Sequence, residues 1–284
     1  MSTIIIGLSV SMVLFLLASG LTLIFGLLKV INFAHGALYM LGAYLAYQIA
    51  LVAGFWWSLV LVPIVLALIG AITERLTLKP IYASPHEYQL VVTFGLVLVF
   101  EEVVRVVWGL SGKSVAAPLW LSGSVELFGT ELSRYRLFVV AVGAAAVALL
   151  LFGIERTRFG LLIRSCSANS LMAATLGIRV ARVRTLVFAA GAALAGFAGV
   201  VTGPMLPIQL QMGSSVILDC FIVIIIGGLG NIRGAVIGAL LIGMMRTYGQ
   251  QYFSEWIELV VYTVLIGTLL VRPQGLFSRK ERLA

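Results

Sequence analysis

The chain has 284 residues, of which 61% are hydrophobic and 11% are charged. Because an ordinary soluble domain carries about 25% charged residues, this composition excludes a water-soluble globular protein. The formal net charge of +8 is concentrated in the segment 155–184 and after Arg272. Short basic segments beside apolar runs are typical of cytoplasmic connections between membrane spans, so the charge indicates membrane topology rather than nucleic-acid binding.

Apolar runs recur along the whole chain and predict an all-α, polytopic membrane bundle of about eight or nine hydrophobic segments. The first run follows no basic leader and precedes no small-residue cleavage site, which favours a retained helix over a signal peptide. The seventh and eighth runs are short or rich in glycine, and we expect broken or re-entrant helices there. The runs cover residues 4–28, 33–54, 58–78, 89–109, 136–154, 185–205, 216–229, 232–248 and 256–271.

The basic segments set the expected topology of a single transmembrane domain over residues 1–284. With 155–184 and the C-terminal tail in the cytoplasm, residues 110–136 and 248–258 fall on the outer side. Counting back places the N-terminus outside if every run crosses, whereas one re-entrant segment reverses it. Cys166 lies in a cytoplasmic segment and Cys220 in an apolar run, so we expect neither a disulfide nor a metal site.

A weak internal repeat places a polar turn before Gly-Ala and an apolar helix at two points, INFAHGALYMLGAY and GGLGNIRGAVIGALLIG. Transporters commonly carry duplicated halves whose broken helices border the transport path. Asn32 has two readings: its side chain caps the following helix, or residues 32–36 are unwound beside the path. A lone histidine offers neither a metal-ligand set nor a catalytic partner. The residues expected at the path are Asn32, Ala34, His35, Gly36, Gly227, Gly228, Gly230 and Asn231.

Small residues at four-residue spacing predict close helix contacts. They form two stripes, which are Gly191, Ala195, Gly199 and Gly203, and Gly234 with Gly238. In lipid, small side chains let helix backbones approach and gain packing contacts. We interpret both stripes as packing surfaces.

The ionisable residues near the apolar runs each have a structural explanation. Glu101 and Arg105 stand one helical turn apart, which predicts a self-neutralising pair near the outer end of a span, with Glu102 solvated. Asp219 is open to two interpretations, which are contact with a substrate's ammonium group and capping of its own helix.

The stretch WGLSGKS resembles a phosphate-binding loop. The pattern requires a glycine five places before Gly112, and Val107 occupies that position. We therefore expect no ATP binding through this motif.

The basic segment RTRFGLLIRSCSANSLMAATLGI predicts a short helix within the 155–184 connection. Asn169 is a suitable N-cap for a helix over Ser170–Leu176, and Gly177 supplies a left-handed stop. Such a helix suits either an anionic lipid surface or a groove on a partner protein. Its expected apolar face consists of Met172, Ala173 and Leu176.

Three stretches together resemble the permease subunits of branched-chain amino-acid ABC importers of the leucine/isoleucine/valine type: GLTLIFGLLKVINFAHGALYMLGAY, RTRFGLLIRSCSANSLMAATLGI and GGLGNIRGAVIGALLIG. The resemblance covers essentially the whole chain. It implies a pore of two permeases, two cytoplasmic ATPases and an extracytoplasmic substrate-binding protein. This chain would then have no catalytic site and no cofactor, and would lie in the bacterial plasma (inner) membrane with its C-terminus in the cytoplasm.

The resemblance also implies roles for individual residues. The 155–184 loop is similar to the coupling helix that docks on the ATPase, and residues 32–36 are similar to a break in an early helix beside the path. Family members often carry charged residues where this chain has Asn169 and Ser170, so no salt bridge to the ATPase is implied there. The implied coupling residues are Arg158, Gly160, Arg164, Ser165, Asn169, Met172, Ala173, Leu176 and Gly177.

The expected function is alternating-access import of branched-chain or related aliphatic amino acids, driven by the partner ATPase. Two alternatives stay open. A urea or short-amide importer permease shares these motifs, although FAHGALYMLGAY favours the amino-acid branch. A stand-alone secondary transporter or channel would place ion-coupling carboxylates deep in the spans, whereas the acids here lie mostly near their ends.

Overall fold

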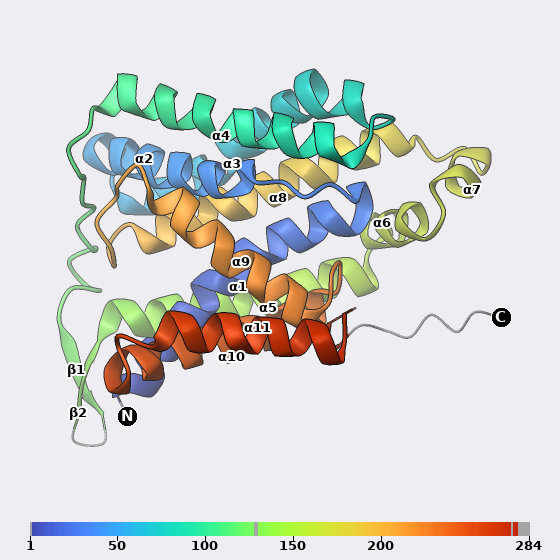
Figure 1. The fold of residues 1–284 in the computed structure, drawn as a ribbon. Helices are drawn as coiled ribbons and strands as arrows, with labels where there is room; N and C mark the ends of the chain where they lie inside the picture. The colour runs from blue at the N-terminus through green and yellow to red at the C-terminus, as the bar shows by residue number, and fades with distance from the viewer. Residues whose placement is uncertain (1, 128–129, 274, 278–284) are drawn as a thin grey trace.

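Long apolar stretches separated by short polar turns fold into a bundle of helices (Figure 1). The computed structural model describes residues 2–127, 130–273 and 275–277. The α-helices in these ranges are α1 (Ser2–Leu28), α2 (Ala34–Ala53), α3 (Phe55–Thr73), α4 (His86–Trp108), α5 (Arg134–Arg156), α6 (Arg158–Ala168), α7 (Ser170–Thr175), α8 (Val180–Thr202), α9 (Met212–Gly227), α10 (Ile232–Tyr252) and α11 (Ile257–Val271).

Shorter elements lie at the two ends of the bundle. A π-helical turn, η1 (Glu74–Leu78), and a 3-10 turn, η2 (Lys79–Ile81), extend α3 toward α4. Strands β1 (Ser124–Leu127) and β2 (Thr130–Ser133) form an antiparallel hairpin. The hairpin lies at one end of the bundle and α7 at the other (Figure 1), and we call these the hairpin end and the α7 end.

The prediction of a polytopic helical membrane bundle is confirmed. Within the described ranges, five helical stretches are long and apolar enough to cross a membrane, which are Ser2–Leu28, Ala34–Ala53, Phe55–Ile81, Arg134–Arg156 and Val180–Thr202. The expected short run 216–229 corresponds to α9, whose 16 residues extend for about 24 Å, less than the roughly 30 Å of a hydrocarbon core. The run 232–248 was expected to be short or glycine-rich and its helix broken or re-entrant, but α10 is one continuous helix of 21 residues because it continues through polar residues to Tyr252.

The first helix of the chain occupies the middle of the bundle. α1 packs most extensively against α10 and α8, and also against α5 and α9. Every residue from Ser11 to Ile24 is buried. The buried hydroxyls of α1 donate to carbonyl oxygens three or four residues earlier in the same helix, so they need no partner elsewhere.

The predicted small-residue stripes are packing surfaces. A Cβ atom on Gly199 of α8 would lie 2.5 Å from the Tyr39 carbonyl oxygen of α2, and one on Gly191 would lie 2.9 Å from the Gly20 carbonyl oxygen of α1. A Cβ atom on Gly238 of α10 would lie 2.6 Å from a carbonyl oxygen of α9. Helix backbones therefore come into direct contact at these glycine residues, which have no side chain to separate them.

Candidate translocation and coupling sites

The polar stretch after α1 forms a break between two helices. Residues 29–33 are not helical, and Lys29 takes a left-handed φ of 58° as α1 ends. The N-cap of α2 is Phe33, and no side chain caps that helix, so the capping interpretation of Asn32 is wrong. The expected unwound stretch is shorter than 32–36, because Ala34, His35 and Gly36 already belong to the first turn of α2.

Asn32 and His35 carry buried polar atoms at this break. Both residues are fully buried. His35 Nε2 lies 3.0 Å from the Leu17 carbonyl oxygen, so Nε2 carries the proton and Nδ1 is the acceptor. His35 Nδ1 and both polar atoms of the Asn32 side chain have no hydrogen-bond partner. An unsatisfied buried polar group costs about 1–3 kcal/mol. A polar molecule bound at the break would offset this cost by forming hydrogen bonds with these atoms.

The second polar turn joins α9 to α10. Gly228 and Gly230 have φ values of 97° and 80°, a region that favours glycine. Gly227 meets Gly234 backbone to backbone, and Asn231 Nδ2 donates to the Phe277 carbonyl oxygen at 2.7 Å. The turn therefore reverses the chain sharply between two tightly packed helices.

The structure places the first turn of α2 and the second polar turn at different levels of the bundle. Gly36 packs against Gly213 at the start of α9, whereas Gly227 is the last residue of that helix. These positions on α9 are about 21 Å apart at 1.5 Å per residue. A Cβ atom on Gly230 would lie 3.1 Å from the Gly26 Cα atom in the last turn of α1, so the second turn lies beside the start of the first break and away from its end.

The ion pair at the end of α4 differs from the expected one. Arg105 pairs with Glu102 at 2.5 Å, and both side chains are about half exposed. Glu101 instead accepts a hydrogen bond of 2.8 Å from Ser214 Oγ at the start of α9. The predicted pair of Glu101 with Arg105 is wrong, because Glu102 lies three residues from the same arginine and reaches it first.

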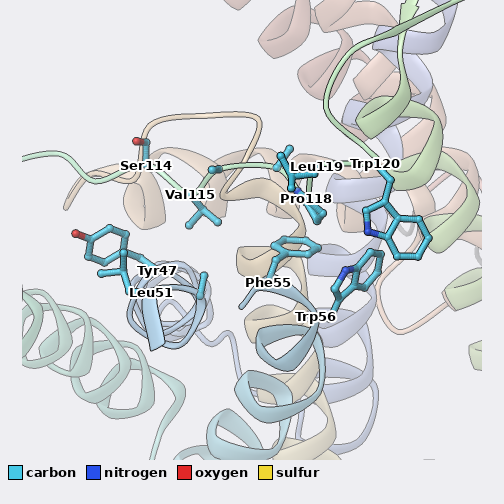
Figure 2. A pocket seen from close by; sticks show the side chains of 12 residues that line it. Tyr47, Leu51, Phe55, Trp56, Ser114, Val115, Pro118, Leu119 and Trp120 are labelled. Carbon is cyan, nitrogen blue, oxygen red and sulfur yellow. The ribbon is translucent and has the colours of Figure 1, made fainter. Parts of the chain in front are cut away.

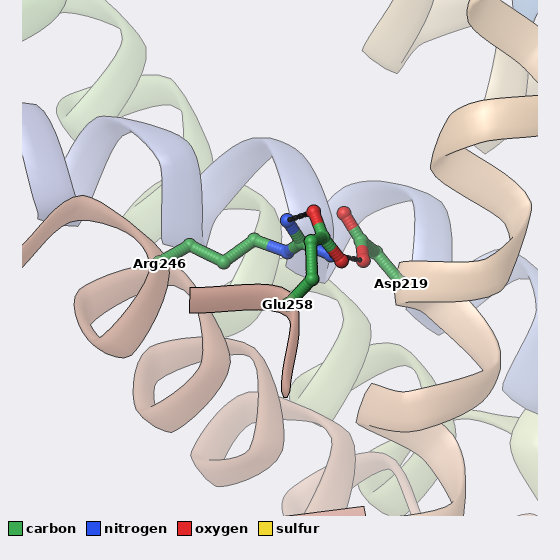
Figure 3. A network of polar contacts seen from close by, with 3 residues as sticks. All are labelled: Asp219, Arg246 and Glu258. Carbon is green, nitrogen blue, oxygen red and sulfur yellow. Dashed lines mark hydrogen bonds and ion pairs between the residues drawn. The ribbon is translucent and has the colours of Figure 1, made fainter. Parts of the chain in front are cut away.

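A three-residue charge cluster joins α9, α10 and α11 (Figure 3). Arg246 of α10 lies 2.5 Å from an Asp219 carboxylate oxygen and 2.9 Å from a Glu258 carboxylate oxygen. Asp219 does not cap its helix, because α9 begins seven residues earlier at Met212. Asp219 is thus paired with a cation, which matches the rule that ionisable groups near lipid are paired.

A pocket of about 480 Å³ opens at the hairpin end, between the α2–α3 junction and the extended segment 114–120. Phe55 and Trp56 lie opposite Pro118 and Trp120 (Figure 2), and the two indole rings are 5.4 Å apart. None of its lining residues is charged. The pocket suits an apolar group rather than the ammonium and carboxylate groups of an amino acid. Sequence reasoning missed it, although the aromatic cluster at 55–57 was a signal.

The capping predictions for the helix in the basic segment are confirmed. Asn169 Oδ1 accepts a hydrogen bond of 2.9 Å from the Met172 amide at the start of α7. Gly177 has a φ of 83°, and its amide donates to the Ala174 carbonyl oxygen at 3.0 Å. The Ile178 amide donates to the Ala173 carbonyl oxygen at 3.0 Å, which completes a Schellman motif. α7 is therefore fixed at both ends.

The exposed face of α7 differs from the predicted one. Ala173 is 3% exposed and belongs to the protein's own core, so it cannot be part of a free surface. Leu171, Met172 and Leu176 are 77%, 58% and 76% exposed. A helix of six residues is too short for periodicity to tell its two faces apart, and Leu171 was therefore missed. We call these three side chains the α7 apolar face.

The other predicted coupling residues build the support for α7. The Thr157 hydroxyl caps α6 by accepting from the Gly160 amide at 3.1 Å, and Gly160 packs against the Ile154 carbonyl group. Arg164 donates to that same carbonyl oxygen at the end of α5. Ser165 bonds within α6, and Arg158 is exposed. Of the two predicted coupling arginines, Arg164 thus bonds within the protein, whereas Arg158 is left for contact with a partner protein.

Helices interrupted beside buried polar atoms are typical of membrane transport proteins. The family model for the permease component of branched-chain amino acid transport systems matches residues 3–269, and the chain belongs to this family. It is a multi-pass membrane permease of the ABC importer type.

Named relatives cover nearly all of the chain. The high-affinity branched-chain amino acid permease protein LivH of Salmonella typhimurium is 31% identical over 283 residues, which is 94% of this chain and 91% of LivH. BraD of Pseudomonas aeruginosa, described in the same way, is 29% identical over 97% of this chain and 94% of BraD. The permease protein LivM of Escherichia coli is 25% identical over 94% of this chain and 68% of LivM. No solved structure matches the chain.

Proposed function

We propose that this permease carries branched-chain or related aliphatic amino acids inward, driven by an ATPase subunit that docks on the α7 apolar face. The supporting observation is α7 itself. Its ends are fixed by Asn169 and by the Gly177 motif, yet it presents three exposed apolar side chains at one end of the bundle. Exposed apolar side chains on a rigid helix favour a protein groove over water.

The proposed orientation places the α7 end in the cytoplasm. Basic residues gather there at the end of α5, on α6 and before α8, which is the arrangement favoured on the cytoplasmic side. The N-terminus of α1 lies at the hairpin end (Figure 1), so it would face outward, and α11 would run toward the cytoplasm. A binding protein would then deliver substrate at the hairpin end.

The proposed path runs beside the break at residues 29–33, where Asn32 and His35 supply buried polar atoms. A second permease, either a copy of this chain or a paralogue, would complete it. The relatives support a paralogue, because LivH and LivM are both named permeases of the high-affinity branched-chain amino acid system. The Gly227–Asn231 turn would belong to the cytoplasmic side of this path.

Docking on α7 is tested by a charge placed on its apolar face. Leu176→Glu should reduce co-purification of the cognate ATPase by about tenfold or more, because burying an unpaired charge costs more than about 1.4 kcal/mol. The matched control is Leu110→Glu, an equally exposed leucine at the other end of the bundle. If Leu176→Glu and the control retain the same amount of ATPase, α7 is not the docking element.

Substrate class is tested by uptake into proteoliposomes that contain both permeases, the ATPase and the binding protein. Radiolabelled leucine, isoleucine and valine should accumulate only with ATP, and excess unlabelled leucine should compete. Accumulation of urea or a short amide in place of leucine would reject the amino-acid assignment. Accumulation without ATP, driven by an ion gradient, would reject the importer class.

A further inference from the structure

A buried carboxylate lies at the end of a largely apolar helix, next to the exposed Arg75 and apart from the path and the α7 apolar face. Glu74 is 1% exposed and stands where α3 changes into the π-helical turn η1. A buried ionised carboxylate is costly unless hydrogen bonds satisfy it. π-helical turns within helices occur frequently at functional sites. Glu74 was missed from the sequence, although an acid inside the run 58–78 was itself a signal.

Two hydroxyl groups from different parts of the chain satisfy this carboxylate. Tyr82 Oη donates to Glu74 Oε1 at 2.6 Å, and Thr185 Oγ1 donates to Glu74 Oε2 at 2.7 Å. Burial and the bond to Glu74 raise the pKa of the Tyr82 phenol, so it stays protonated and remains a donor at neutral pH. One carboxylate therefore joins the end of α3, the turn before α4 and the second turn of α8.

A cation lies against the same cluster. The Arg184 guanidinium is 5.0 Å from the centre of the Tyr82 ring, within the roughly 6 Å of a cation–π contact. Arg184 is also close enough to Cys166 of α6 to lower its thiol pKa, against the larger effect of burial, which raises it. The cluster thus lies where α3 packs against α8, and α8 also contacts α6.

Very little chain separates this cluster from α7. The Ile178 amide donates to the Ala173 carbonyl oxygen of α7 at 3.0 Å, and the Ile178 carbonyl oxygen accepts from the Val180 amide at 2.9 Å. Val180 is already the first residue of α8. Because hydrogen bonds run without a gap from α7 into α8, a displacement of α7 moves the first turns of α8, including Thr185.

We propose that Glu74 is a positioning residue that transmits displacement of α7 through Thr185 to α3 and, through Tyr82, to the turn before α4. The proposal rests on the proposed function, because the displacement comes from the ATPase docked on α7. A carboxylate suits this role: it accepts both hydroxyl bonds at once, and hydrogen bonds to a charged group are stronger than neutral ones. A glutamine of the same shape offers one carbonyl oxygen and turns an NH₂ donor toward the other hydroxyl.

The first test needs only the full-length permease in lipid nanodiscs. Spin labels are placed on α7 at Leu176→Cys and on α3 at Leu68→Cys, two exposed positions, while the native cysteines are buried. The distance distribution should be narrow with Glu74 and broader with Glu74→Gln or Thr185→Val. The control is Thr77→Val, because the Thr77 hydroxyl donates to the Thr73 carbonyl oxygen of its own helix and, among the described residues, joins no other element. An unchanged distribution in Glu74→Gln and Thr185→Val would overturn the proposal.

The second test measures coupling in the reconstituted complex of both permeases, the ATPase and the binding protein. Glu74→Gln should bind the ATPase as the wild type does and keep its basal hydrolysis. The amount of substrate imported per ATP should fall by about fivefold or more, the lower end of usual coupling between sites. Thr77→Val should keep the wild-type ratio.

The outcomes separate the two proposals. If uptake and hydrolysis fall together with folded yield while their ratio stays at the wild-type value, Glu74 is only a structural residue and the inference is wrong. If the wild-type chain binds no ATPase, the proposed function fails and the transmission role fails with it. A broadened distance distribution in Glu74→Gln would still show, in that case, that Glu74 holds α3 and α8 together.

Discussion

Replacing Gly199 by alanine should destabilise the contact between α2 and α8. A Cβ atom at this position would lie 2.5 Å from the Tyr39 carbonyl oxygen and 2.7 Å from the Ala43 amide nitrogen, and both atoms belong to the backbone of α2. Neither atom can move aside as a side chain would. The two helices must therefore separate by about 0.9 Å to reach the 3.4 Å at which ordinary contact begins.

The cost follows from this separation. Overfilling a tightly packed contact costs about 1–3 kcal/mol, which changes the folding equilibrium by about 5- to 140-fold. A Gly→Ala substitution within a helix also stabilises that helix by up to about 1 kcal/mol. This gain opposes the packing cost, so a control variant has to measure it separately. Gly95→Ala supplies the control, because Gly95 lies within α4 and no atom lies within 4 Å of its Cβ position.

The assay is equilibrium unfolding of the purified permease in lipid bicelles. Gly95→Ala should match the wild type or exceed it in stability, and Gly199→Ala should fall below both. Equal stability of the two variants would show that the backbones of α2 and α8 do not approach each other as described. The role of small residues as the packing surface would then be wrong for this pair of helices.

Three further outcomes are expected. Cys166 is buried, and burial raises its thiol pKa. A hydrophilic maleimide should therefore label a cysteine introduced by Leu171→Cys much faster than it labels Cys166. Equal labelling rates would contradict the placement of α6. Arg246→Met leaves the mostly buried Asp219 carboxylate without its cation and should lower the unfolding free energy by about 1–3 kcal/mol. Glu258→Gln, at an exposed position, should cost about 1 kcal/mol or less in the same assay. Gly177→Val should reduce ATPase co-purification but not folded yield, since a left-handed φ costs a β-branched residue about 1–2 kcal/mol. Gly177→Asn should retain more ATPase than Gly177→Val, because asparagine tolerates a left-handed φ.

The features that local signals determine were predictable. Apolar runs longer than a span predicted the helical bundle, because in lipid the backbone must satisfy its own hydrogen bonds. Asn169 and Gly177 predicted the ends of α7, because each acts on a backbone group within a few residues. The stripe containing Gly199 predicted a helix contact, although its partner on α2 could not be named.

The features that depend on distant partners were not predictable. Glu74 and Thr185 are 111 residues apart in the sequence, and nothing local to either identifies the other. Arg105 had two acids within reach, and spacing alone did not choose between them. Ala173 was assigned to the free face of α7, because only the position of the other helices determines which side of so short a helix is covered.

The central place of α1 has a consequence for how the chain is made. α1 leaves the ribosome before its main partners, α8 and α10, which end at Thr202 and Tyr252. At about 5–20 residues per second, α1 waits on the order of 10–45 s in the bilayer before the last of them is complete. Its buried serine and threonine hydroxyls bond to its own backbone, so the middle of the isolated helix exposes few unsatisfied polar groups to lipid during that interval. The helix that ends in the core is therefore chemically suited to surviving alone at the membrane until the rest of the protein assembles around it.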